Sequence, residues 1–113
     1  GLTSLTISNN IMTMSDGTFS ACKNLTSVTI SDGVKGIGSS VFSHCENLEY
    51  ITISDSVTEI GENAFWGCHK LQTVKMGKGL KDIGNSAFSC CYKLSNITIP
   101  DSVTSIGEIV VVL

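Results

Sequence analysis

The chain has 113 residues, a length that predicts one domain spanning residues 1–113. Its composition, 42% hydrophobic and 15% charged, excludes an intrinsically disordered protein. The formal net charge of −3 argues against nucleic-acid binding, because phosphates are bound by basic surfaces. No run of 18 apolar residues occurs, so no membrane span is predicted.

A 23-residue period runs through the chain and is clearest in residues 48–70. Shifting this segment by one period in either direction places apolar residues on apolar residues at seven positions. Those positions are Leu48, Ile51, Ile53, Val57, Ile60, Phe65 and Cys68. The period divides the chain into coils one to five, at residues 2–24, 25–47, 48–70, 71–93 and 94–113, the last incomplete. A fixed period of this length is typical of solenoid proteins.

Each coil opens with the pattern of a strand that is buried on one face. In coil three, apolar and polar residues alternate, so Ile51 and Ile53 are expected to point inward. Tyr50 and Thr52 are then expected to point outward. A turn of Ser, Asp, Gly or Pro residues follows this strand.

Two further elements complete each coil. A second short extended segment runs from Val57 to Gly61, and a glycine recurs at the position of Gly61 in four coils. This recurrence predicts a positive φ or a close backbone approach. Residues 62–70 predict a short helix, because Phe65 and Cys68 lie three residues apart, on one face of such a helix.

No coil of this length can bury its apolar edge alone, so each must pack against the next. Parallel strands joined by helical returns predict a right-handed α/β solenoid of five coils. We expect its parallel β-sheet on the concave side and its short helices on the other side.

Four of the five cysteines, Cys22, Cys45, Cys68 and Cys91, share one position of the repeat. This regularity favours a buried column in which cysteine acts as a small hydrophobic residue. Disulfides and a metal site are the alternatives. Cys90 is out of phase with the others and is the candidate for a reactive or partly exposed thiol.

The sequence contains no phosphate-binding glycine loop and no nucleophile motif, so no enzyme activity and no cofactor are predicted. His44 precedes Cys45 and His69 follows Cys68, which raises the question of a metal site. The phased cysteines are expected to point inward, however, and no C-x-x-C pair occurs. No metal site is therefore predicted.

The outward strand positions form two rows that are candidates for contact with a partner. They contain Ser27, Thr29, Tyr50, Thr52, Thr73, Lys75, Asn96 and Thr98. Tyr50 and Lys75 interrupt rows that otherwise carry small polar residues, so they are the leading contact candidates. The alternative is that threonine simply suits an exposed strand.

Trp66 follows the core residue Phe65 at a position where other coils carry serine. A tryptophan pointing outward would be a hot spot for partner binding. The alternative is that it lies across His69 or across the neighbouring coil.

The pattern L-x-x-I-x-I-[SP]-D-S-V-T-x-I-G-x-x-A-F-x-x-C resembles the BspA-type leucine-rich repeat of bacterial and protist surface proteins. Residues 48–68 match nearly every position, and the resemblance extends over residues 2–108. It implies a right-handed leucine-rich repeat superhelix. It also implies an extracellular or cell-surface location and adhesion through contact with host or neighbouring-cell proteins. It supplies no catalytic residues. The first residues lack the pattern of a signal peptide, so the signal of a secreted protein is expected to have been removed or to lie upstream of this segment.

The two ends depart from the repeat, and residues 109–113 are wholly apolar. The segment is expected to be an excerpt of a longer array, to end in a degenerate cap, or to stack head to tail into a filament. The residues expected at such assembly ends are Leu2, Leu5, Ile7, Ile109, Val111 and Leu113. The main partner would then be another copy of the chain rather than a protein ligand.

Two glycosylation sequons begin at Asn24 and Asn96. They arise easily by chance in a chain rich in threonine.

A glycan is also a candidate for the bound partner, without a specific motif to support it.

Overall fold

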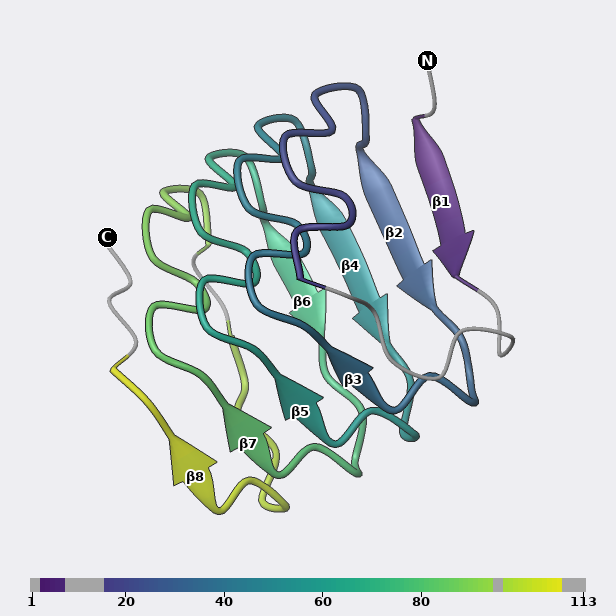
Figure 1. Ribbon diagram of the computed structural model, residues 1–113, viewed down its shortest axis with the longest axis vertical. Coiled ribbons are helices and arrows are strands. Elements are labelled where there is room, and N and C mark those ends of the chain that lie inside the picture. Colours follow the sequence, from purple (N-terminus) through teal and green to yellow (C-terminus); the bar gives the residue numbers. More distant parts are fainter. Residues whose placement is uncertain (1–2, 8–15, 95–96, 109–113) are drawn as a thin grey trace.

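The computed structural model describes residues 3–7, 16–94 and 97–108. These residues form eight strands, and the chain winds as a solenoid through two parallel sheets (Figure 1). The first sheet contains β1 (Ser4–Ile7), β2 (Ser27–Ile30), β4 (Tyr50–Ile53) and β6 (Thr73–Lys75). The second contains β3 (Gly36–Ile37), β5 (Glu59–Ile60), β7 (Asp82–Ile83) and β8 (Ser105–Ile106).

Neighbouring strands of the first sheet align at a shift of one repeat. Tyr50 of β4 pairs with Ser27 of β2 and with Thr73 of β6. The inward residue Ile51 is buried in the core. In the second sheet Ile60 pairs with Ile83, again at a shift of one repeat. The prediction of a solenoid with parallel strands is therefore confirmed.

The helix predicted at residues 62–70 is wrong, because no described residue is helical. Asn63 has a φ of 58° and Gly67 a φ of 79°. Both values lie in the left-handed region, so a right-handed helix cannot pass through either residue. Without a helix, the described residues also contain none that could cross a membrane.

Hydrogen bonds between coils replace the helix. The Trp66 N–H donates to the Asn63 carbonyl at 3.1 Å within coil three, whereas the Phe65 N–H donates to the Ala87 carbonyl of coil four at 2.8 Å. A helix would keep its donors within one segment. We call residues 62–70 and their equivalents in the other coils the turn wall. Part of the backbone hydrogen bonding of the turn wall is therefore made to the neighbouring coils.

One column of phenylalanine rings fills the centre of the solenoid. Phe19, Phe42, Phe65 and Phe88 stack with ring centroids 5.5, 5.5 and 5.3 Å apart and interplanar angles of 8° or less. Phe42, Phe65 and Phe88 are fully buried. Burial of such rings is a large part of the hydrophobic stabilisation of a small domain.

The buried cysteine column is also confirmed for three of its four predicted members, while Cys22 is half-buried. Cys45, Cys68 and Cys91 are buried, and all five thiols of the chain are free. The Cys68 S–H donates to the Phe42 carbonyl at 3.2 Å, and Cys45 and Cys91 make the same bond one coil earlier and later. Burial raises the pKa of Cys45 to about 11 and that of Cys91 to about 12. These thiols are therefore protonated and poorly nucleophilic at neutral pH.

The recurring glycine is explained by close approach and not by a positive φ. A Cβ placed on Gly61 would lie 2.6 Å from the backbone of Gly38 in the preceding coil. The same distance separates a Cβ on Gly84 from the Glu62 nitrogen. Neither glycine has a positive φ. A side chain here would push two coils apart.

Candidate binding surface

The outward face of the first sheet carries most of the predicted contact residues. The register places Ser27, Tyr50 and Thr73 in one row. Thr29, Thr52 and Lys75 form the second row. The two rows therefore lie on one face of the first sheet, as predicted.

One predicted member of this face, Thr98, is exposed but belongs to no strand. Another, Asn96, lies outside the described residues. The face as described therefore ends at β6.

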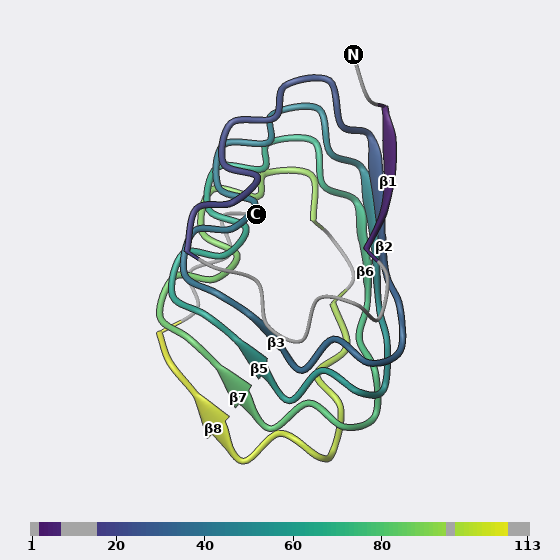
Figure 2. The ribbon, with the colours of Figure 1, turned by 45° about the vertical axis from the view of Figure 1, so that its right-hand side comes forward.

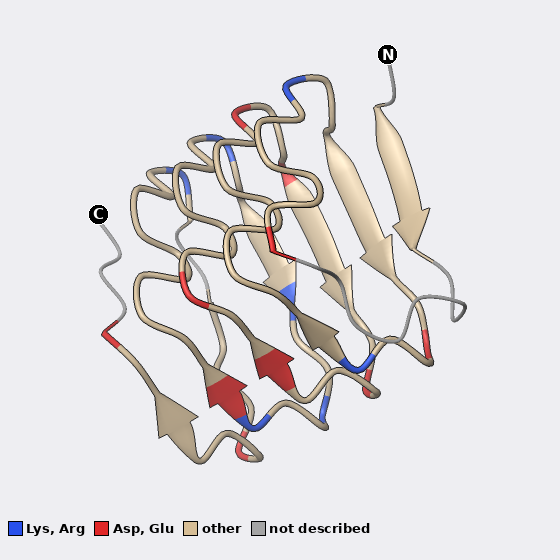
Figure 3. Cartoon of the chain, viewed as in Figure 1, with Lys and Arg blue, Asp and Glu red and all other residues tan. Residues whose placement is uncertain are grey.

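Tyr50 is the largest side chain on this face and is 49% exposed. It stands on β4, which has a strand on each side. Its neighbours in both rows carry hydroxyl groups, apart from Lys75, whose position on β6 is basic in Figure 3. The face thus carries one exposed aromatic ring, that of Tyr50, among small hydroxyl donors and acceptors. Lys75 adds a single positive charge near the edge of this face.

A groove borders this face beside β6. Its volume is about 460 Å³. Its lining consists of Thr73, Val74, Lys75, Met76, Thr98 and Pro100. The sequence pattern did not indicate this groove, because residues 94–99 match the strand pattern and should have closed it.

Trp66 packs across the neighbouring coil. Its ring lies edge-on to the His44 imidazole, with centroids 4.7 Å apart and planes at 70°. A Cβ on Gly67 would lie 3.1 Å from the His44 Nδ1, so His44 also covers that glycine. Trp66 is half-buried, which agrees with the alternative that its ring lies across the neighbouring coil.

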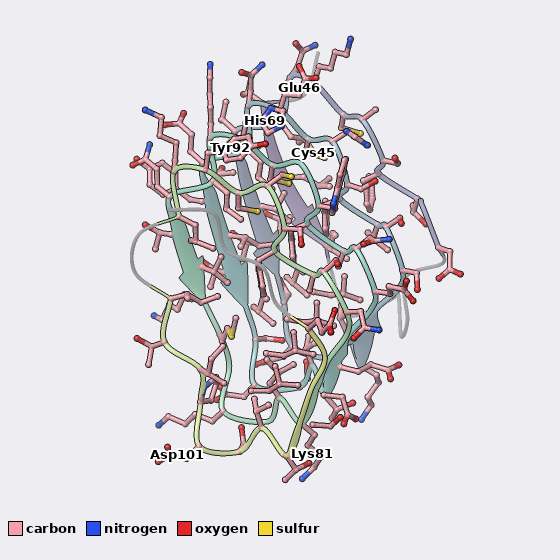
Figure 4. The ribbon with its side chains drawn as sticks, turned by 90° about the vertical axis from the view of Figure 1, so that its left-hand side faces the viewer. Cys45, Glu46, His69, Lys81, Tyr92 and Asp101 are labelled. Atoms are coloured by element: carbon pink, nitrogen blue, oxygen red, sulfur yellow. The ribbon has the colours of Figure 1, made fainter. Side chains whose placement is uncertain are left out.

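A second aromatic pair lies on an edge of the turn wall, where Figure 4 labels its two members. The rings of His69 and Tyr92 stack with centroids 5.1 Å apart and planes at 23°. Tyr92 is 53% exposed. A hydrogen bond with Cys90 raises the pKa of the Tyr92 hydroxyl above its usual value. Sequence reasoning missed Tyr92, although it shares a repeat position with His69.

The outward face of the second sheet carries a row of acidic residues. Glu59 on β5 pairs in register with Asp82 on β7, and both strands are red in Figure 3. Together with Glu62 these residues line a shallow hollow of about 420 Å³. The shared repeat position of Glu59 and Asp82 could have revealed the row.

The described residues contain no group of three or more His, Cys, Asp or Glu side chains placed to hold a metal ion. Cys90 is half-buried, as is Cys22 of the first coil, whereas Cys45, Cys68 and Cys91 are buried. Its greater reactivity remains a prediction.

The predicted assembly ends are described only in part. Leu2, Ile109, Val111 and Leu113 lie outside the described residues. Ile7 is already buried within the first coil, whereas Leu5 is half-buried. Leu5, Phe19 and Cys22 help line a hollow of about 270 Å³ at the first coil.

The family model of the "BspA type Leucine rich repeat region" matches residues 1–110, in six copies. No protein with a curated description matches the chain.

Three solved structures show the same fold. A leucine-rich repeat protein of T. pallidum is 28% identical over 93% of this chain, with a TM-score of 0.89. A leucine-rich repeat protein of Bacteroides ovatus is 34% identical over 92%, with a TM-score of 0.84. A leucine rich cell surface protein of Faecalibacterium prausnitzii is 30% identical over 94%, with a TM-score of 0.68. The chain covers 51%, 29% and 35% of these three chains, respectively.

Proposed function

Because this chain belongs to the BspA-type leucine-rich repeat family, we propose that it is a non-enzymatic recognition module at a cell surface. It binds a protein of a host or a neighbouring cell through the outward face of the first sheet. The surface location is supported by the 30% identical relative that is described as a cell surface protein.

The observation that carries this proposal is the exposure of Tyr50 on an interior strand of the first sheet. An aromatic ring that folding leaves 49% exposed, flanked by strands on both sides, is a suitable anchor for an interface. The surrounding hydroxyl groups can donate or accept hydrogen bonds around such an anchor. The face therefore offers an apolar centre and a polar surround, the usual organisation of a protein interface.

A display library of random peptides tests the proposal without a known partner. Clones selected on the wild-type chain are expected to bind the Tyr50→Ser variant at least about tenfold more weakly, as for a hot-spot residue. The matched control is Tyr92→Ser, which removes an equally exposed tyrosine from another surface. Circular dichroism checks that both variants fold. Equal binding to the wild type and Tyr50→Ser would reject this face.

A second candidate function is end-to-end self-assembly. The observation that favours it is Ile106, which is 52% exposed although its equivalent Ile83 in the preceding coil is buried. At the other end of the solenoid, Leu5 is half-buried in the first coil. Such unequal ends can join as a heterologous contact between copies.

Mixing two blocked variants tests this second candidate. Leu5→Lys blocks one end and Ile106→Lys the other, so neither variant should assemble alone while an equimolar mixture forms a heterodimer. Sedimentation velocity distinguishes the two species. A mixture that stays monomeric would reject end-to-end assembly.

A further inference from the structure

Coil four carries three exposed lysines, Lys75, Lys78 and Lys81, spaced three residues apart. Lys75 is the last residue of β6 in the first sheet, and Lys81 directly precedes β7 in the second. The three lysines therefore follow the chain where it turns from one sheet to the other, at the lower edge of the solenoid in Figure 2. Figure 3 marks this part of coil four blue at β6, in the turn and beside β7. We name these three residues the basic stripe.

The basic stripe occurs in coil four only. At the same three positions, coil three carries Thr52, Asp55 and Thr58, and coil five carries Thr98, Asp101 and Thr104. Lys35 in coil two is the one further lysine at any of these positions. The repeat therefore does not require lysine at these positions, and the stripe distinguishes coil four from its neighbours.

Contacts within the fold do not account for the three lysines. None of their ammonium groups takes part in a hydrogen bond or an ion pair within the part of the chain that the structure describes. In coil three, the Asp55 carboxylate accepts a hydrogen bond of 2.7 Å from the Lys78 N–H. A lysine side chain has no acceptor, so Lys78 cannot make the equivalent bond to coil five. Attraction to neighbouring aspartates accounts for Lys78 alone, because Lys75 and Lys81 have threonine at the equivalent positions on both sides.

The residues on either side of Lys78 leave its side chain without an obstacle along the chain. Both are glycines, and a Cβ on Gly77 would collide with the Ser54 carbonyl of coil three. A Cβ on Gly79 would collide with the Asp55 carbonyl. The close packing of coils three and four thus excludes side chains at both positions, and the Lys78 ammonium has no adjacent side chain beside it.

Acidic residues limit the width of an anion that the basic stripe can accept. Neighbouring coils are about 4.8 Å apart, so Asp55 and Asp101 lie roughly that distance to either side of Lys78. Beyond Lys81, the chain enters the acidic row in which Glu59 pairs with Asp82. A broad polyanion would meet these carboxylates and be repelled. A single extended chain that follows coil four would not.

The basic stripe begins next to the anchor of the proposed interface. Lys75 pairs in register with Thr52, and Tyr50 precedes Thr52 by two residues on β4. With a rise of about 3.3 Å per residue and a strand spacing of about 4.8 Å, the Tyr50 and Lys75 Cα atoms lie roughly 8 Å apart. A partner segment that contacts Tyr50 therefore reaches Lys75 after about three residues.

We propose that the basic stripe binds an extended acidic segment of the protein partner, an inference that rests on the proposed function. The segment carries three carboxylates, one for each lysine, about three residues apart. Three residues of extended chain span at most about 11 Å, in the lysine stripe as in the segment, so the two spacings match. Continuity with the Tyr50 face favours a protein segment over another anion. Such charge complementarity fixes the register of the partner and speeds its association.

The probe is the peptide Glu-Ser-Thr-Glu-Ser-Thr-Glu with both ends blocked, so that its three carboxylates are its only charges. It is titrated into the nitrogen-15-labelled chain at about 50 mM salt, and the amide shifts give both the Kd and the location. Shifts are expected in residues 75–82 and not in the turn wall. Binding should be lost at about 0.5 M salt, because exposed charges are then screened. No binding, or shifts confined to other surfaces, would overturn the proposal.

Removal of charge tests the three lysines. The triple variant Lys75→Gln, Lys78→Gln, Lys81→Gln should bind the peptide about tenfold more weakly, as expected for the loss of three exposed ion pairs. The matched control removes the same number of charges from exposed positions of the turn wall, by Lys23→Gln, Lys70→Gln and Lys93→Gln. It should bind as the wild type does, and circular dichroism checks that both variants fold. Equal weakening by the two variants would overturn the proposal, because net charge would then explain the binding.

Two further probes test the spacing and the class of ligand. The peptide Ser-Thr-Glu-Glu-Glu-Ser-Thr has the same composition, but its clustered carboxylates cannot reach three lysines at once. It should bind about threefold or more weakly. Equal binding of the two peptides would overturn the match of one carboxylate to each lysine. A trisulfated oligosaccharide has the same charge, and tighter binding of this probe to the same lysines would overturn the protein segment in favour of an anionic glycan.

The outcomes separate this inference from the proposed function. Library clones that depend on Tyr50, together with an acidic peptide that fails to bind, would reject the basic stripe alone. A peptide that binds at the stripe, together with clones indifferent to Tyr50, would reject the outward face and leave the stripe as the supported site. If both proposals hold, the Tyr50-dependent clones should themselves be rich in Asp and Glu and should lose affinity for the triple variant of the stripe.

Discussion

Coil three and coil five follow the same residue pattern but differ in burial. Ile60 in coil three is 2% exposed, whereas Ile106, its equivalent in coil five, is 52% exposed. Coil three packs against a coil on each side, while coil five has only coil four beside it among the described residues. The comparison teaches that burial in this fold is supplied by neighbouring coils and not by a coil's own sequence.

The largest difference is expected from core truncation. Phe65→Ala should lower the free energy of unfolding by about 3–5 kcal/mol, because it leaves a cavity between two stacked rings. Ile106→Ala should cost less than about 1 kcal/mol, since half of the side chain is already in water. Urea denaturation measures both variants. Equal costs would contradict the comparison.

A smaller difference is expected at the recurring glycine. Gly61→Ala places a Cβ 2.6 Å from the backbone of coil two and should cost about 1–3 kcal/mol. Gly107→Ala meets the Asn85 nitrogen at the same 2.6 Å. We expect it to cost less, because coil five can move away from its one neighbour. Gly36→Ala is the control, since its Cβ meets only the flexible side chain of Glu59. A larger loss in the free energy of unfolding for Gly107→Ala than for Gly61→Ala would contradict the comparison.

Thiol labelling extends the comparison to the cysteine column. Iodoacetamide at about pH 8 should modify Cys90 at least about tenfold faster than Cys68, because only the thiolate reacts and burial raises the pKa of Cys68. Cys22, half-buried in the first coil, should react at an intermediate rate. Raising the pH toward 11 should narrow the gap between Cys45 and Cys90, since Cys45 has a pKa of about 11 and ionises there. Mass spectrometry of peptides gives each rate, and uniform labelling of all five thiols would exclude the buried column.

The smallest effect is expected on the outward face. Thr52→Ala should change the free energy of unfolding by no more than about 0.5 kcal/mol, because its side chain is exposed. Thermal and urea denaturation measure this change. A cost close to that of Phe65→Ala would mean that the inward and outward assignments are exchanged.

The strands and columns could be predicted because the repeat itself records them. Alternation at Ile51 and Ile53 sets which face is buried, and the period sets which residue lies beside which. The register of Tyr50 with Ser27 and Thr73 follows from the period alone. The outward face was therefore located correctly, although its function as a binding site is a proposal.

The turn wall could not be predicted from the same pattern. A spacing of three between Phe65 and Cys68 fits a tight turn as well as a helix. Ser40, His44 and Ser86 adopt a positive φ of 57–59° without being glycine, so the left-handed positions leave little trace in composition. The groove beside β6 was missed for another reason, since Ile97 and Ile99 carry the strand pattern without joining the sheet.

The backbone bonds that run from coil to coil also determine how the molecule responds to force. Each coil depends on its neighbours for much of its backbone hydrogen bonding, so tension applied along the chain should peel coils away one after another instead of rupturing the molecule at once. Each step would release one repeat of extended polypeptide, roughly 80 Å long. A chain of this construction can lengthen under a pull and still keep its remaining coils folded.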